Sequence, residues 1–97
     1  MTDVQLSPAA RVDLDEIWDY SARRWRVDQA ERYIRAIVEA CHEIAVGHRE
    51  GIAVDYIRRG YRKLAVGSQF VFYRQGAVGP EIIRVLHQRM DVGARLR

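Results

Sequence analysis

The sequence predicts an α+β domain in the order β-α-α-β-β-β, with a helical hairpin packed on a small antiparallel sheet. Two adjoining segments in the first half repeat apolar residues at intervals of three and four, as amphipathic helices do. The last third alternates apolar and polar residues in short segments separated by glycine turns, which is typical of hairpin strands. A length of 97 residues allows one domain, 1–97, and no second core.

The first strand and the first helix adjoin. Val4-Gln5-Leu6 alternates and predicts a short strand, which Ser7-Pro8 ends. Ser7 is suited to cap a helix, and a proline at the first helical position sacrifices no hydrogen bond. The apolar period then continues, which predicts a helix from about Pro8 to Trp25.

A second helix begins almost at once. Asp28 and Glu31 have the spacing of a capping box, with Asp28 as the N-cap, and Gly47 stands where a C′ glycine belongs. The linker Arg26-Val27 is so short that the two helices must be antiparallel neighbours.

Three strands are predicted after a segment without periodicity. We expect residues 48–60 to form a loop with at most one helical turn and to be the most mobile segment. Strands follow at 61–66, 69–74 and 81–87. Gly67-Ser68 fits a type II′ hairpin turn, whereas 75–80 predicts a looser turn.

Charge is unevenly distributed along the chain. Residues 1–50 carry seven arginines and ten acidic residues, a net charge of −3, whereas residues 51–97 carry nine basic and three acidic residues, a net charge of +6. The basic half favours an acidic partner or a nucleic acid. No apolar run approaches the ~18 residues of a membrane span, and the N-terminus has no secretion signal. With Cys41 as the one cysteine, we expect a cytoplasmic protein without membrane contact.

Candidate chemistry is sparse. His42, His48, His87 and Cys41 lack the spacing of metal ligands, so we expect neither a metal site nor a cofactor. Arg62, Lys63 and His87 could together serve a metal-free nuclease, with cations to hold phosphate and a base to activate a ribose hydroxyl. The spacing alone favours the alternative, in which these side chains are solvated and His87 ends a strand.

Several segments, taken in order, resemble the ParE-type toxins of the ParE/RelE superfamily. These segments are LSPAA (6–10), DLDEIWDY (13–20), VDQAERY (27–33), GYRKL (60–64), VGS (66–68), FYR (72–74) and RVLHQRMD (84–91). The resemblance implies the toxin of a bacterial type II toxin–antitoxin system. ParE-type members inhibit DNA gyrase, and a ParD-like antitoxin neutralises them in a hetero-oligomer that represses its own operon. RelE-type members share the fold but cut messenger RNA on the ribosome.

Two positions favour the ParE branch, and hence a protein that is not an enzyme. Gln69 stands where RelE-type nucleases carry a strand arginine, and no tyrosine follows Tyr73 near the C-terminus. The alternatives are a RelE-type endoribonuclease that uses Arg62, Lys63 and His87, or an inactive relative that keeps only antitoxin binding.

Two sets of binding residues follow from the resemblance and from residue type. Tyr, Trp and Arg are the usual anchors of protein interfaces, although core packing is an equal alternative for Trp18 and Tyr33. Operator DNA would be bound only through the antitoxin. The predicted target-binding residues are Arg84, His87, Arg89, Met90 and Asp91, and the predicted antitoxin-binding residues are Trp18, Tyr20, Trp25, Tyr33, Arg62 and Arg74.

Overall fold

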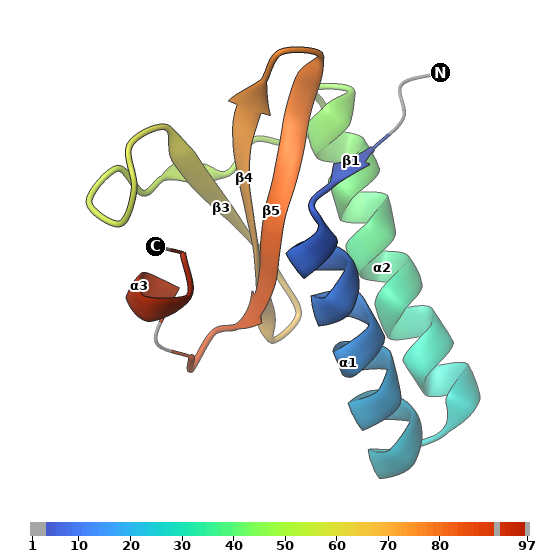
Figure 1. The fold of residues 1–97 in the computed structure, drawn as a ribbon. Coiled ribbons are helices and arrows are strands. Elements are labelled where there is room, and N and C mark those ends of the chain that lie inside the picture. Colours follow the sequence, from blue (N-terminus) through green and yellow to red (C-terminus); the bar gives the residue numbers. More distant parts are fainter. Residues whose placement is uncertain (1–3, 91, 97) are drawn as a thin grey trace.

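The computed structural model describes residues 4–90 and 92–96 and has a helical hairpin on one face of a five-stranded sheet (Figure 1). The strands lie in the order β1-β5-β4-β3-β2, in which β1 is parallel to β5 and the other neighbours are antiparallel. The predicted α+β class is therefore confirmed. The elements are β1 (Gln5–Leu6), α1 (Pro8–Arg24), α2 (Val27–Ala45), β2 (Ile52–Ala53), β3 (Tyr61–Val66), β4 (Gln69–Gly76), β5 (Gly79–His87) and α3 (Val92–Arg95).

The start of α1 confirms the Ser7-Pro8 prediction. The Ser7 side-chain oxygen accepts a hydrogen bond from the Ala10 N–H at 3.0 Å, while its hydroxyl donates to the Ile83 carbonyl at 2.6 Å. One hydroxyl thus caps the helix and joins it to β5. The helix ends at Arg24, one residue before the predicted end.

The capping box predicted for α2 is wrong. Arg26 is the N-cap, in an extended conformation and without a side-chain cap, so Asp28 lies inside the first turn. Asp28 instead pairs with Arg26 at 3.6 Å and Arg32 at 4.0 Å. Its negative charge is also stabilised by the positive end of the helix dipole. The short link between the helices explains the early start, because it leaves no residue for a longer approach.

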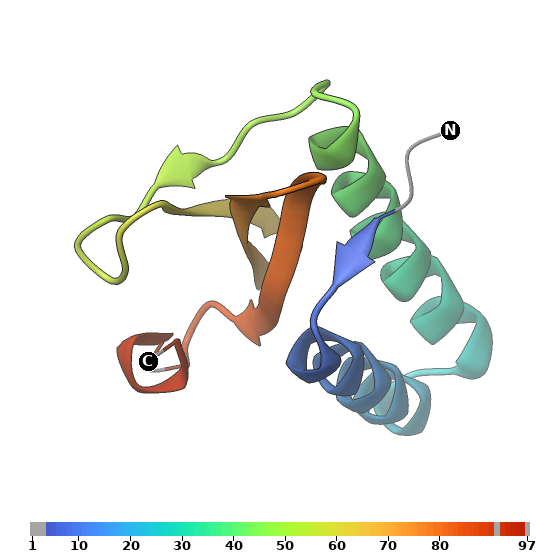
Figure 2. The ribbon, with the colours of Figure 1, turned by 45° about the horizontal axis from the view of Figure 1, so that its top comes forward.

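The sheet has a hydrophobic core on each face, so β5 contributes apolar residues to both. The helical hairpin covers one face, and Figure 2 shows α3 on the opposite side of the sheet. The hairpin-side core includes Ala10, Ile37, Cys41, Ile44, Val71, Tyr73, Ile82 and Val85. The second core contains Val54, Tyr61, Phe72, Leu86 and Leu96.

The segment 48–60 contains a short strand, β2, and the prediction that it forms only a loop is therefore wrong. Ile52 pairs with Lys63 and Ala53 with Arg62, so β2 extends the sheet, and Val54 is fully buried. The helix α3 was also not predicted. The second hairpin is tight, because β4 runs to Gly76 and β5 begins at Gly79, rather than turning loosely over 75–80.

The first hairpin turn, between β3 and β4, matches its prediction. Gly67 has φ +57 and Ser68 does not have a positive φ, which is the φ pattern of a type II′ turn. The Ser68 N–H donates to the Tyr33 hydroxyl at 3.0 Å, so the turn is attached to α2. This attachment places the start of β4 beside the helical hairpin.

Candidate functional site

A buried ion pair joins α1 to β5. The Arg84 guanidinium donates to both carboxylate oxygens of Asp13 at 2.8 Å, and the Val85 N–H donates to the same carboxylate at 2.9 Å. Hydrogen bonding to Asp13, with the charge of that carboxylate, raises the pKa of Arg84. A further bond from Arg84 to the Arg95 carbonyl, at 3.2 Å, reaches α3.

This geometry gives Arg84 a structural role that the sequence did not reveal. Its side chain is only 20% exposed and bonds both to Asp13 of α1 and to the Arg95 carbonyl of α3, two helices on opposite sides of the sheet (Figure 2). The expected target contact of Arg84 stays a prediction, and it would use the small part of the side chain that is exposed. Asp13, a residue absent from the predicted sites, is the partner that holds it.

The residues after β5 form a turn that is attached to the first hairpin. The Gln88 N–H donates to the Ser68 carbonyl at 2.9 Å, and its side-chain amide donates to the Gly67 carbonyl at 3.1 Å. The Arg89 N–H donates to Nδ1 of His87 at 3.1 Å. Arg89 and Met90 are exposed. We call residues 87–90 the terminal turn; of the predicted target set, Asp91 lies outside the described residues.

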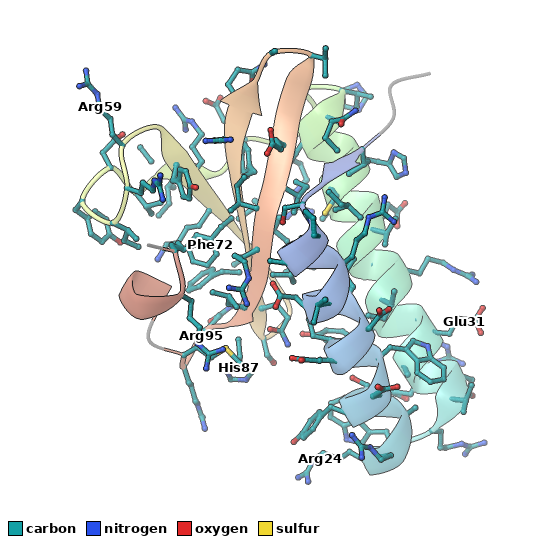
Figure 3. All side chains as sticks on the ribbon, in the orientation of Figure 1. Arg24, Glu31, Arg59, Phe72, His87 and Arg95 are labelled. Carbon is teal, nitrogen blue, oxygen red and sulfur yellow. The ribbon has the colours of Figure 1, made fainter. Side chains whose placement is uncertain are left out.

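A pocket of about 440 Å³ lies between α1 and the end of the sheet that carries the β3–β4 turn and the terminal turn. Figure 3 labels His87 and Arg95, which both line it. Its lining is mostly apolar and aromatic, and comes from both helices of the hairpin, strands β4 and β5, both turns and the C-terminal segment. The lining residues are Asp13, Glu16, Ile17, Tyr20, Ser21, Trp25, Tyr33, Ser68, Gln69, Val85, Leu86, His87, Met90 and Arg95.

The pocket brings together residues from both predicted sets. Tyr20, Trp25 and Tyr33 were expected to bind an antitoxin, and His87 and Met90 to bind a target. Tyr20 and Trp25 stack edge to face, with ring centroids 6.5 Å apart. Both are more than half exposed. An aromatic wall of this kind is suited to a protein partner.

The remaining predicted antitoxin residues lie elsewhere. Trp18 is on α1 and 37% exposed, but it is not part of the pocket. Arg62 donates to the Gly51 carbonyl at 2.6 Å and pairs with Glu50 at 3.2 Å. Arg74 pairs with Glu81 at 3.6 Å. Of the six residues, Tyr20, Trp25 and Tyr33 line the pocket and the other three do not.

The three residues of the nuclease alternative do not converge. Arg62 and Lys63 are successive strand residues, so their side chains leave opposite faces of the sheet. Lys63 is opposite Phe72, which is opposite Arg84, so Lys63 is about 10 Å along the sheet from His87 and about 10 Å across two strand spacings. The ammonium of Lys63 instead lies 4.2 Å from the centroid of the Phe70 ring.

Gln69 is a site residue that the sequence reasoning treated only as a missing arginine. It lines the pocket, is 7% exposed, and its Oε1 is buried without a hydrogen-bond partner. Alternation contained a signal, because Gln69, Val71 and Tyr73 occupy every second position of β4 and the latter two belong to the hairpin-side core. A polar residue in such a row needs an explanation.

Other chemistry finds little support in the part of the chain that the structure describes. Residues 4–90 and 92–96 contain no group of three His, Cys, Asp or Glu side chains placed to hold a metal ion. Burial raises the pKa of the Cys41 thiol to about 11, which keeps it protonated and unreactive at neutral pH. None of the described helices combines the length and the apolar character needed to cross a membrane.

Comparison with known proteins identifies close relatives. Residues 4–92 match the family model described as the ParE toxin of the type II toxin–antitoxin system parDE. Toxin ParE1 of Mycobacterium tuberculosis H37Rv is 52% identical over 92 residues, which cover 94% of each chain. Toxin ParE1 of Caulobacter vibrioides is 47% identical over 96 residues, 99% of each chain.

A solved structure, that of a chromosomal ParDE toxin–antitoxin system from P. aeruginosa, shares the fold. It has a TM-score of 0.76 at 20% sequence identity, over 90% of this chain and 96% of that chain. The sequence matches and the fold agree. This chain therefore belongs to the family of ParE toxins of type II toxin–antitoxin systems.

Proposed function

We propose that this toxin inhibits DNA gyrase by binding to it rather than by catalysing a reaction. The observation that carries the proposal is the match to ParE toxins along nearly the whole chain. The separation of Arg62, Lys63 and His87 supports a binding role over a nuclease, because phosphate cleavage needs its base and cations around one phosphate.

The terminal turn, residues 87–90, is the proposed target surface. Arg89 and Met90 project from a turn that Gln88 attaches to the first hairpin through two hydrogen bonds. A turn that is already ordered loses little conformational freedom when it binds. Asp91 and the exposed part of Arg84 complete the predicted set.

A ParD-like antitoxin is the proposed regulatory partner. The similar solved structure is that of a ParDE system, and this chain presents an aromatic wall beside the terminal turn. An acidic antitoxin segment that folds on binding would complement the net charge of +6 in residues 51–97. The complex would repress its own operon, with the antitoxin making the DNA contacts.

Two parallel assays test the gyrase proposal. Purified toxin is added to gyrase with supercoiled plasmid, and separately to ribosomes programmed with messenger RNA. Trapped, cleaved plasmid without cleaved messenger RNA is the expected result. Cleaved messenger RNA with normal gyrase activity would establish the endoribonuclease alternative. No effect in either assay, with antitoxin binding retained, would indicate an inactive relative.

Arg89→Ala tests the target surface. Loss of an exposed interface arginine should raise the toxin concentration needed to inhibit gyrase by about tenfold, without weakening antitoxin binding. Arg59→Ala is the matched control, because Arg59 is also exposed but lies in the loop before β3, on a different part of the molecule (Figure 3). Equal potency of the two variants would remove Arg89 from the target surface.

A further inference from the structure

The floor of the pocket contains one polar group that the fold does not use. Gln69 is the first residue of β4, opposite His87 in the sheet, and its side chain lies on the face that the helical hairpin covers. Its Oε1 is buried and has no donor among the described residues. A buried acceptor without a donor raises the free energy of the unbound protein, and a donor from a ligand would remove that cost.

The surroundings of Gln69 define what this ligand must be. Ile17, Val85 and Leu86 supply apolar surface, and Tyr20 and Trp25 supply aromatic rings. A volume of about 440 Å³ accommodates a large side chain. The matching side chain is therefore mostly apolar, with a hydrogen-bond donor at its tip, as in Trp or Tyr.

The charges around the pocket favour a neutral donor over a cation. Asp13 and Arg84 neutralise each other through their two hydrogen bonds. Glu16 and Arg95, which also line the pocket, have opposite charges. These four charges sum to zero, so a Lys or Arg side chain would gain little attraction to offset the cost of losing its hydration.

We propose that Gln69 is a specificity residue for the antitoxin: the pocket receives a Trp or Tyr side chain of the ParD-like antitoxin, whose N–H or O–H donates to Oε1. This inference rests on the proposed function, in which such an antitoxin binds the toxin. The last side-chain torsion of Gln69 is soft, so its amide can reorient towards the donor when the ring enters the pocket. The inserted ring would contact His87 and Met90, so it would also cover part of the terminal turn.

That position explains why the antitoxin, rather than the target, is the expected occupant. The terminal turn presents Arg89 outwards, while the pocket extends behind it to α1. A segment that orders itself on binding can place a side chain in such a recess, behind the outward-facing Arg89. Neutralisation would then result from occupation of the same end of the molecule.

The test is a double-mutant cycle between the toxin and its ParD-like antitoxin, with binding measured by calorimetry. In the toxin, Gln69→Met removes the acceptor at similar size, and Gln75→Met makes the same change at an exposed position of the same strand. In the antitoxin, each Tyr and Trp is changed to Phe, which removes the donor and keeps a ring. Thermal unfolding of both toxin variants establishes that they fold, and Gln69→Leu provides a second removal of the acceptor.

We expect Gln69→Met to weaken binding about tenfold and Gln75→Met to leave it within about twofold. One antitoxin substitution should cost wild-type toxin a similar factor and cost the Gln69→Met variant nothing further. Unchanged binding by a folded Gln69→Met variant, or an antitoxin without a coupled Tyr or Trp, would overturn this inference alone. Failure of the wild-type toxin to bind the antitoxin would overturn the antitoxin proposal as well. Gyrase inhibition that depends on Gln69, with antitoxin binding that does not, would assign the pocket to the target.

Discussion

Replacing Asp13 by alanine should destabilise this toxin more than any exposed substitution on the same helix. The carboxylate is 6% exposed and accepts three hydrogen bonds, two from the Arg84 guanidinium and one from the Val85 N–H. Its removal leaves a largely buried cation without its counterion and a β5 edge N–H without an acceptor. Both groups would then be poorly solvated in the folded protein.

The size of this effect follows from the burial of the pair. Removing one partner of a buried ion pair costs about 3–5 kcal/mol. Arg84 is 20% exposed and keeps its bond to the Arg95 carbonyl, which places the loss near the lower limit. We expect Asp13→Ala to lower the free energy of unfolding by about 3 kcal/mol, which corresponds to a Tm lower by roughly 12–24 °C in a domain of this size. Asp13→Asn, which keeps the shape, should cost about 2 kcal/mol.

Urea and thermal unfolding followed by circular dichroism measure these losses. Asp15→Ala is the control, because Asp15 is exposed on the same helix two residues away, and it should change stability by less than about 0.5 kcal/mol. A loss below about 1 kcal/mol for Asp13→Ala, with an unchanged fold, would refute the reasoning. It would mean that water replaces the hydrogen bonds that Asp13 accepts, at little cost in free energy.

Two further predictions concern the core and the β3 edge. Burial raises the pKa of Cys41 from 9.0 to about 11, so the thiol ionises first in the unfolded chain; its contribution to stability is full below pH 9 and is lost as the pH rises towards 11. Urea unfolding should show wild type losing about 2 kcal/mol more than Cys41→Ala over that range, and parallel pH profiles would contradict this. Gly51→Ala should cost about 1–3 kcal/mol, because the added Cβ would overlap the Lys63 carbonyl oxygen and approach the Tyr73 ring. An unchanged urea midpoint would show that the chain can move away from β3.

Local chemistry is what made much of the fold predictable. Ser7 and Pro8 begin a helix through their own side chains and backbone, and Gly67 forms its turn because it can adopt a positive φ. Such features depend on a few neighbouring residues. Short segments of the sequence also showed the family resemblance, and the family match along residues 4–92 confirmed it.

The failed predictions concern one helix start, set by the short link beside it, and two elements whose energy comes from distant residues. Asp28 and Glu31 have capping-box spacing, but the short link to α1 makes Arg26 the N-cap. Ile52 and Ala53 have no strand pattern of their own, and they form β2 because β3 offers them an edge. The helix α3 follows from the need to cover the second face of the sheet, where Leu96 joins Phe72 and Leu86.

The sequence by itself determined the class of the protein, its helical hairpin, its first hairpin turn and its membership of a toxin family, because each depends on residues close together in the chain. Only the tertiary structure decided which side chains act together. It paired Asp13 with Arg84, 71 residues away, dispersed Arg62, Lys63 and His87, and placed Gln69 at the floor of a pocket. Contacts of that kind are set by strand order and by which face each residue occupies, and a one-residue change of register would reverse them.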